Sequence, residues 1–246
     1  MRYFIEFSYK GTAYHGWQRQ NNAVSVQEKI ENAIRVLLSD SVDIVGSSRT
    51  DTGVHAEQQY AHFDFENELK ISLQNIEYRL NAMLPKDIAI HRVFQVPADA
   101  HSRFDALFRR YEYRIITKKN PFLFENAWLY KGFLDLEKMN QAAALLLKYK
   151  DFESFSKLHT DVKTHICQIS IAEWKQVNDT ITFTVQANRF LRGMVRALVG
   201  TLIEVGKGKM TTDEFEEIIR AKDRKKAGAQ APALGLTLVE VAYGEL

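Results

Sequence analysis

The stretch VDIVGSSRTDTGVHAEQQYAHFDFE, residues 42–66, predicts two strands joined by a tight polar loop. The apolar run at its start and the alternating pattern at its end are both typical of strands. Between them, GSSRTDTGVHA (46–56) is rich in small residues that favour turns through local side-chain hydrogen bonds or permissive dihedrals. The loop carries one carboxylate, Asp51, two residues after Arg49. A turn alone explains the small residues, so the meaning of Asp51 depends on the rest of the chain.

The segments on either side of this pair predict the order strand, helix, strand, strand, helix, strand. Alternating apolar residues indicate the strands, and apolar stripes at helical spacing indicate the helices. Ser25 and Glu28 are placed to form a capping box at the start of the first helix. Around the pair, the segments are RYFIEFSY (2–9), SVQEKIENAIRVLLS (25–39), SLQNIEYRLNAML (72–84) and DIAIHRVFQV (87–96).

The second half of the chain repeats this order, with an extra helix before its last strand. Asn178 and Asp179 supply the turn of its hairpin. Its segments are RRYEYRIIT (109–117), DLEKMNQAAALLLKY (135–149), the hairpin HICQISIAEWKQV (165–177) with TITFTVQA (180–187), RFLRGMVRALVGTLIEVG (189–206), TDEFEEIIRA (212–221) and LTLVEVAY (236–243).

This repeated order predicts an α+β fold of two ferredoxin-like βαββαβ halves. We expect an extended mixed, mostly antiparallel sheet with helices packed on one face and a central cleft. The expected halves are residues 1–100, which carry the Asp51 loop, and residues 101–246. The joint between them is PADAHSRFDALF (97–108).

Composition narrows the class of protein. The chain has 246 residues, 46% of them hydrophobic, which is enough for a sizeable core in one large domain or two modest halves. It has no run of about 18 apolar residues for a membrane span, and its first residues lack the zones of a signal peptide. Cys167 is the only cysteine, which excludes an internal disulfide and a cysteine-based zinc cluster. The reducing cytoplasm is therefore the expected compartment.

Charge distribution leaves two interpretations open. The net charge of +2 is a weak argument for a nucleic-acid partner, but the basic residues gather in clusters apart from acidic runs such as DEFEE (213–217). Such clusters suit an RNA-binding surface and equally an ordinary solvated surface. They are Arg103, Arg109, Arg110, Arg114, Lys118 and Lys119; Arg189, Arg192 and Arg196 at helical spacing; and Lys222, Arg224, Lys225 and Lys226.

Ordered motifs along nearly the whole chain resemble the TruA family of tRNA pseudouridine synthases. The loop at 46–56 has that family's form G-x-x-R-T-D-x-G-V-H-A, in which the aspartate is catalytic. Lys10, where many relatives have aspartate, and Thr52, where alanine is common, are small departures that bear on substrate preference. The other matching segments are YKGTAYHGWQRQ (9–20) followed by SVQEKIENAI (25–34), RLNAMLPKDI (79–88), HSRFDALFRRYEYRI (101–115), NRFLRGMVRALVGTLIEVG (188–206) and APALGLTLVEVAY (231–243).

The resemblance implies the pseudouridine synthase fold and an isomerase that turns uridine into pseudouridine. The C1′–N1 bond breaks, the uracil rotates and a C1′–C5 bond forms. Nothing is oxidised, reduced or hydrolysed, so we expect no cofactor and no metal. An ionised carboxylate is required, and the resemblance assigns that role of nucleophile to Asp51. It also implies that Arg196 pairs with Asp51, because a nearby cation depresses the pKa of an acid; the pattern alone equally allows a solvated helix arginine.

A tyrosine is expected to stack on the target uracil, an interaction worth about 1–3 kcal/mol. Tyr111 and Tyr113 share one face of their strand by alternation, so the pattern does not choose between them. The resemblance favours Tyr111. Ordinary strand packing is the alternative for a tyrosine at such a position.

The resemblance implies a tRNA substrate, at uridines 38, 39 and 40 of the anticodon stem-loop, and a homodimer whose second subunit extends the basic surface. Arg49 is expected to contact phosphate or to fill the gap left by the displaced base. His55 and His101 are expected to be structural or RNA-contacting, with no pattern for a metal. The other expected RNA contacts are Arg110, Lys118, Lys119, Arg192 and Lys225, with Lys222, Arg224 and Lys226 as further candidates.

Two other classes remain as alternatives. A non-catalytic RNA-binding protein of paired sheet modules would not explain a carboxylate facing RNA, and neither half contains an aromatic-rich RNP1-like octamer. A metal-dependent hydrolase that uses Asp51 lacks a second carboxylate or histidine at short spacing.

Overall fold

The computed structural model describes residues 1–66, 69, 71–157 and 162–244. The chain forms two compact units, Met1–Leu107 with Leu238–Leu246, and Phe108–Thr237. The units divide at residues 107 and 108, near the end of the expected joint, whereas the sequence placed the boundary at 100. The sequence also assigned the last strand to the C-terminal half. In the structure this strand groups with the first unit from Leu238 onward.

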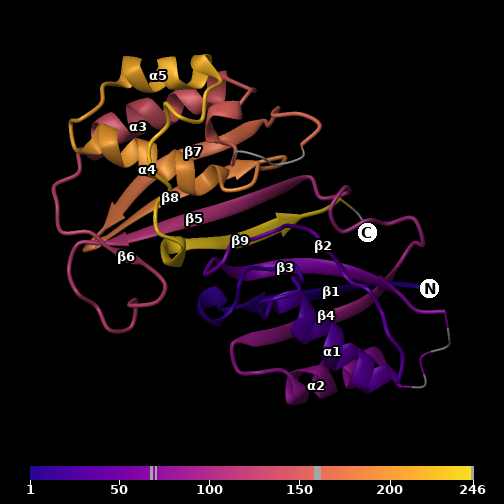
Figure 1. Ribbon diagram of the computed structural model, residues 1–246. Helices are drawn as coiled ribbons and strands as arrows, with labels where there is room; N and C mark the ends of the chain where they lie inside the picture. The colour runs from indigo at the N-terminus through magenta and orange to yellow at the C-terminus, as the bar shows by residue number, and fades with distance from the viewer. Residues whose placement is uncertain (67–68, 70, 158–161, 245–246) are drawn as a thin grey trace. The chain divides into compact units, whose positions relative to one another are not determined.

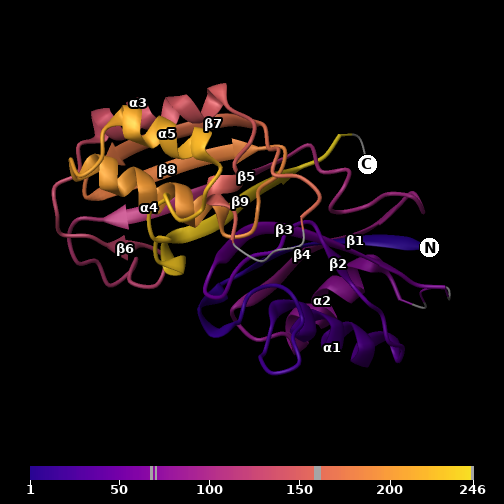
Figure 2. The ribbon, with the colours of Figure 1, turned by 45° about the horizontal axis from the view of Figure 1, so that its top comes forward.

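In the first unit, the first strand of the chain lies between β4 and β3. In strand order the unit reads β4-β1-β3-β9, and β1 is antiparallel to both of its neighbours. Figure 1 and Figure 2 show its two helices on the same side of these strands. The elements are β1 (Arg2–Tyr9), the 3₁₀ turn η1 (Gly11–Ala13), α1 (Val26–Leu38), β2 (Val45–Gly46), β3 (His55–Asp64), α2 (Leu73–Met83), β4 (Ile88–Val96) and β9 (Leu236–Ala242).

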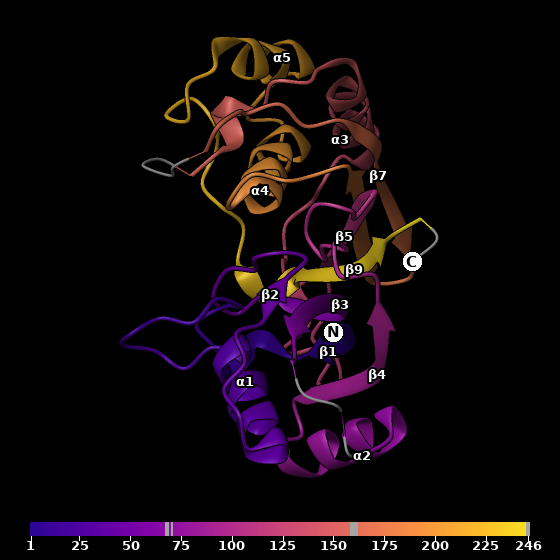
Figure 3. The ribbon, with the colours of Figure 1, turned by 90° about the vertical axis from the view of Figure 1, so that its right-hand side faces the viewer.

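The second unit has an antiparallel core of three strands in the order β5-β8-β7, and a short strand, β6, runs parallel to β5. Figure 3 shows its helices stacked together beside these strands. The elements are β5 (Phe108–Ile116), β6 (Trp128–Leu129), α3 (Leu136–Leu145), η2 (Leu146–Lys148), η3 (Glu153–Phe155), β7 (Ile169–Val177), β8 (Thr180–Ala187), α4 (Met194–Gly206), α5 (Thr212–Ala221) and η4 (Ala233–Gly235).

Helix starts follow the capping signals in the sequence. Ser25 Oγ accepts the backbone N–H of Glu28 at 3.2 Å, which is the Ser25 half of the capping box predicted for α1. A complete capping box forms at α5, where Thr211 and Glu214 bond reciprocally. The helix α4 begins at Met194 rather than at Arg189, because Gly193 before it has φ +70° and is not helical.

The strand expected from VDIVGS is much shorter than the pattern predicts, since only Val45–Gly46 pairs with β3. Side chains of α1 take the backbone groups of Ile44 in place of a strand neighbour. The Ile44 N–H donates to Glu31 Oε1 at 3.1 Å, and the Ile44 carbonyl accepts Gln27 Nε2 at 3.0 Å. The apolar pattern did not show that the Ile44 backbone N–H and carbonyl would bond side chains of a helix rather than a neighbouring strand.

The predicted α+β class, with mostly antiparallel pairing in an open, mixed sheet, is confirmed. The short parallel strand β6 was not predicted, because two residues carry no periodic signal. Among the described residues, none of the helices has the length and apolarity that crossing a membrane requires.

Candidate active site

Asp51 lies in the polar loop between β2 and β3, in the first unit. The backbone N–H of Val54 donates to the Asp51 carbonyl at 3.1 Å, which closes a turn over Thr52 and Gly53. Asp51 is partly exposed and Arg49 is exposed, whereas Thr50 between them is buried. The loop therefore presents a carboxylate and a guanidinium from a backbone that is itself packed.

Side chains of β1 and β3 form a hydrogen-bond network with this loop. Tyr9 Oη lies 2.8 Å from Thr50 Oγ1 and donates to Gln59 Oε1 at 3.0 Å. Gln59 Nε2 in turn donates to the Ser48 carbonyl at 3.1 Å. Tyr9, Thr50 and Gln59 are all buried. A buried polar network in which each member has a partner favours one conformation of the loop.

The segment YKGTAYHGW supplies the second support. The Trp17 N–H donates to the Thr50 carbonyl at 3.2 Å, and the Gly53 N–H donates to the Tyr14 carbonyl at 3.3 Å. Gly16 has φ +88°, and a Cβ there would lie 2.5 Å from the Thr50 carbonyl oxygen. Only glycine allows this backbone conformation and this close approach. This part of the N-terminal motif therefore serves to position the Asp51 loop.

The two histidines of the expected site have structural partners. His55 is buried, and its Nδ1 accepts the Gly11 N–H at 3.0 Å. His101 Nδ1 accepts the Arg103 N–H at 3.1 Å, and burial lowers the His101 pKa. An accepting Nδ1 is unprotonated, so these contacts favour neutral, structural histidines.

In the second unit, the structure distinguishes the two candidate tyrosines. Tyr113 is fully buried and its hydroxyl donates to the Pro232 carbonyl at 2.9 Å. Burial raises the Tyr113 pKa, which Arg196 partly opposes. Tyr111 stands opposite Val185 on β8, and its ring meets Phe190 edge to face at 5.2 Å between centroids. Tyr113 is therefore a core residue. Tyr111 is also buried, at 7% exposed, so its stacking on the target uracil stays a prediction that rests on the family resemblance.

Arg196 is anchored on α4 by the segment that follows α5. Its Nε donates to the Ala231 carbonyl at 2.7 Å, and the Ala231 N–H donates back to the Arg196 carbonyl at 3.0 Å. The segment can lie this close because Gly200 has no side chain, and a Cβ there would clash with the Ala229 carbonyl oxygen. These bonds argue against a freely solvated helix arginine. The pairing of Arg196 with Asp51 stays a prediction.

The basic residues expected to contact RNA differ in their surroundings. Arg110 donates through Nε and Nη2 to Gln186 Oε1, at 2.9 and 2.7 Å. Lys118 Nζ lies 3.1 Å from Asp179 Oδ1 at the surface. Lys119, Arg192 and Lys225 have exposed side chains. All of these residues are in the second unit, and their RNA contacts stay predictions.

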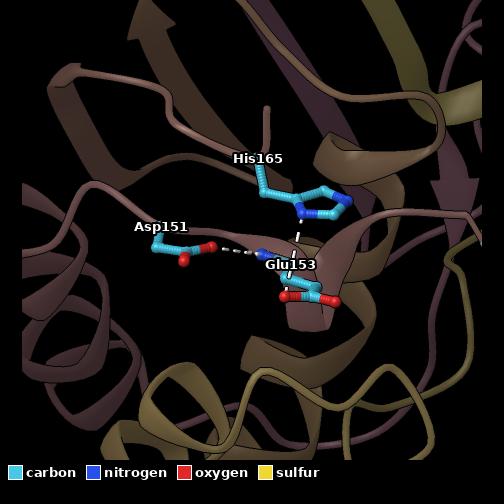
Figure 4. A group of neighbouring side chains, drawn as sticks. All are labelled: Asp151, Glu153 and His165. Carbon is cyan, nitrogen blue, oxygen red and sulfur yellow. Dashed lines mark hydrogen bonds and ion pairs between the residues drawn. The ribbon is translucent and has the colours of Figure 1, made fainter. Parts of the chain in front are cut away.

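Figure 4 shows a group that the sequence did not predict: Asp151, Glu153 and His165, whose ligand atoms lie within 4.8 Å of one another. The Lys222 ammonium already binds Asp151 Oδ2 at 2.8 Å. Asp151 Oδ1 accepts the Glu153 N–H at 3.2 Å, as in an Asx turn. The Lys222 ion pair and the turn therefore account for the arrangement of these side chains. His165 lies too far along the sequence from Asp151 and Glu153 for the three to form a recognisable spacing motif.

Comparison with known proteins shows to which family the chain belongs. A family described as tRNA pseudouridine synthase matches residues 6–105 and 142–244. The chain belongs to this family. It is 50% identical over 243 residues to tRNA pseudouridine synthase A of Bacteroides fragilis, covering 98% of this chain and 96% of that protein. It is 51% identical over 247 residues to the protein of the same name from Bacteroides thetaiotaomicron, covering 99% of this chain and 91% of that one.

Membership of the tRNA pseudouridine synthase family confirms the expected resemblance and the expected enzyme class, an isomerase that forms pseudouridine in tRNA. Sequence reasoning missed the residues that support the Asp51 loop, namely Tyr9, Gln59 and Trp17. In the sequence, Tyr9 and Gln59 are polar residues within apolar strands, and Trp17 lies in the segment YKGTAYHGW with Gly11 and Gly16. These features could not be interpreted without knowing that the N-terminal segment contacts the Asp51 loop.

Proposed function

We propose that this protein converts uridine to pseudouridine at positions 38, 39 and 40 of the tRNA anticodon stem-loop, with Asp51 as the nucleophile. The observation that carries the proposal is the Asp51 loop itself. The Thr50 side chain is hydrogen-bonded to the Tyr9 hydroxyl and its carbonyl accepts the Trp17 N–H, while the Asp51 side chain stays partly exposed. A positioned, ionisable carboxylate on a rigid loop is what this isomerisation requires.

The reaction needs no redox step and no hydrolytic water. The C1′–N1 bond breaks, the uracil turns, the C1′–C5 bond forms, and the proton at C5 is lost while N1 gains one. Asp51 supplies the negative charge for this rearrangement. We therefore propose that the activity needs neither a metal ion nor a cofactor.

Arg196 and Tyr111 complete the proposed machinery. The bond from Arg196 Nε to the Ala231 carbonyl uses one of five guanidinium donors and fixes the orientation of the plane. Such a held cation suits an ion pair with Asp51, which would keep that carboxylate ionised. Tyr111, whose neighbour Tyr113 is committed to Pro232, is proposed to stack on the target uracil.

Arg49 is proposed to contact RNA phosphate or to occupy the space left by the displaced base, because it is exposed two residues from Asp51. Exposed Lys119, Arg192 and Lys225 suit phosphate contacts, which depend on charge more than on shape. A homodimer would extend this basic surface along the tRNA, and the cytoplasm is the proposed compartment.

The test is to map pseudouridine in tRNA from a strain that lacks the gene and from the same strain complemented with it. The proposal predicts loss at positions 38, 39 and 40 and full recovery on complementation. Intact pseudouridine at these positions, with loss elsewhere, would contradict it. Purified protein should also modify an unmodified tRNA transcript equally well with and without EDTA, whereas a metal-dependent enzyme would lose activity.

A further inference from the structure

Two phenylalanines protrude from a loop of the second unit, residues 117–127. Phe122 is 91% exposed and Phe124 is 71% exposed. Figure 1 shows this segment, which follows β5, extending past the end of β6. Single exposed apolar side chains are normal, whereas neighbouring ones that form a contiguous patch mark interaction sites.

The loop is built to hold them in place. Its ends are joined by the β5–β6 ladder, in which Ile115 pairs with Trp128. Inside the loop, the Phe122 N–H donates to Asn120 Oδ1 at 2.9 Å, and the Asn126 N–H donates to the Leu123 carbonyl at 3.0 Å. A compact loop with closed ends and internal turns is frequently functional. The exposed rings are thus presented by a backbone that has little freedom.

The charges beside the rings indicate the partner. Lys118 and Lys119 come just before the loop's turns, and exposed Lys131 follows β6, against one carboxylate in the loop, Glu125. Lys118 Nζ lies 3.1 Å from Asp179 Oδ1, so Lys119 and Lys131 are the cations that carry the argument. Protein interfaces are depleted in lysine, whereas RNA-binding surfaces combine basic residues with aromatic rings that stack on bases. Charge complementarity therefore favours RNA over a second copy of this chain.

We propose that Phe122 and Phe124 form a stacking platform for an unpaired nucleobase of the tRNA substrate, an inference that rests on the proposed function. The loop begins after Ile116, five residues along β5 from Tyr111, or roughly 17 Å at strand spacing. The platform therefore takes a base other than the target uracil. It contributes to tRNA binding and not to the isomerisation step.

The test compares three double variants of the full chain with wild type. Alanine at both positions removes the rings, leucine keeps the apolar volume without a flat face, and tyrosine keeps the flat face. We expect the Phe122→Ala/Phe124→Ala protein to bind an unmodified tRNA transcript at least about ten-fold more weakly. The leucine variant should be weakened similarly, the tyrosine variant should match wild type, and single-turnover rates at saturating tRNA should be unchanged in all three.

Tyr78→Ala is the matched control, because Tyr78 is an aromatic residue 73% exposed on α2 of the first unit. It should leave tRNA affinity unchanged. An unchanged affinity in the alanine variant, or wild-type affinity in the leucine variant, would overturn the platform. Loss of dimer mass in light scattering on alanine substitution would instead assign the rings to a contact between chains. Wild-type protein that binds tRNA without forming pseudouridine would contradict the proposed function. The affinities of the variants would still test the stacking platform by themselves.

Discussion

The hydroxyl groups of Tyr9 and Thr50 lie 2.8 Å apart beneath the Asp51 loop. Because the Tyr9 hydroxyl donates its proton to Gln59 Oε1, Thr50 must donate to Tyr9. The residue next to Asp51 is thereby bonded to the centre of the first unit's sheet. This relationship links the packing of the strands to the position of the proposed nucleophile.

The Tyr9→Phe variant should lose both of these hydrogen bonds and leave buried oxygens of Thr50 and Gln59 without that partner. We expect a decrease of about 1–3 kcal/mol in the free energy of unfolding, measured by urea titration, and a lower single-turnover rate because the loop loosens. Tyr3→Phe on the same strand is the control, since the Tyr3 hydroxyl makes a long contact of 3.6 Å with Met1 Sδ. Equal effects of the two substitutions would argue against a special role for the Tyr9 network.

The Gly16→Ala variant should be destabilised by more than about 2 kcal/mol, because the new Cβ meets the Thr50 carbonyl at 2.5 Å and φ is +88°. Gly208→Ala separates these two causes. Gly208 also has a positive φ, of +70°, but nothing lies within 4 Å of its Cβ position. It should therefore cost only about 1 kcal/mol. If thermal unfolding shows the same loss in both variants, the close approach to Thr50 contributes nothing.

The Arg196→Lys variant should fold nearly as well as wild type yet isomerise uridine at least about 100-fold more slowly. Lysine keeps the charge but has no planar group that can bond Ala231 while it faces an anion. Arg220→Lys on α5 is the control, since Arg220 makes a surface ion pair with Glu216 at 3.0 Å. Nearly normal single-turnover rates in Arg196→Lys would show that orientation of this cation is unimportant.

A pH effect on stability is expected at His62. Burial, together with the charges of Arg2 and His101, lowers the His62 pKa to about 4, while Asp64 and Asp105 oppose this decrease. The unfolded chain therefore binds more protons than the folded chain between pH 6.5 and 4. The stability that a neutral His62 provides is complete above the unfolded pKa and is lost as the pH falls toward the folded one.

The His62→Asn variant keeps an acceptor near the Ser102 backbone N–H, which donates to His62 Nδ1 at 3.3 Å. Its urea midpoint should fall less between pH 7 and 4.5 than that of wild type. His101 retains its own lowered pKa in both proteins, so some pH dependence persists. Parallel pH profiles for the two proteins would remove His62 as the cause.

Periodicity predicted the long strands and most helices because each buries one face. The segment 212–221 was predicted with the bounds that α5 has, since an N-cap and a clear apolar stripe define it. The segment 42–46 was not, because the backbone of Ile44 bonds side chains of α1 rather than a strand. Such partners depend on tertiary contact and leave no pattern in the sequence.

The candidate site was predicted in part for the same reason. The roles of Asp51, Arg196 and Tyr111 were predicted by resemblance to a family motif and stay predictions, whereas alternation alone could not separate Tyr111 from Tyr113. The hydrogen bond from Tyr113 to Pro232 joins residues 119 positions apart, which no local pattern reports. The exposed Phe122 and Phe124 were likewise indistinguishable from core phenylalanines until their exposure was known.

The most direct test of the central claim is the Asp51→Asn variant, assayed for pseudouridine formation and for tRNA binding on the same preparation. The substitution removes the charge but keeps the size, and the Val54 N–H still has the backbone carbonyl of residue 51 as its acceptor. We expect correct folding, undetectable pseudouridine, and tRNA affinity equal to wild type or slightly tighter, because one negative charge near phosphate is gone. Turnover close to that of wild type in this variant would contradict the assignment of Asp51 as the nucleophile.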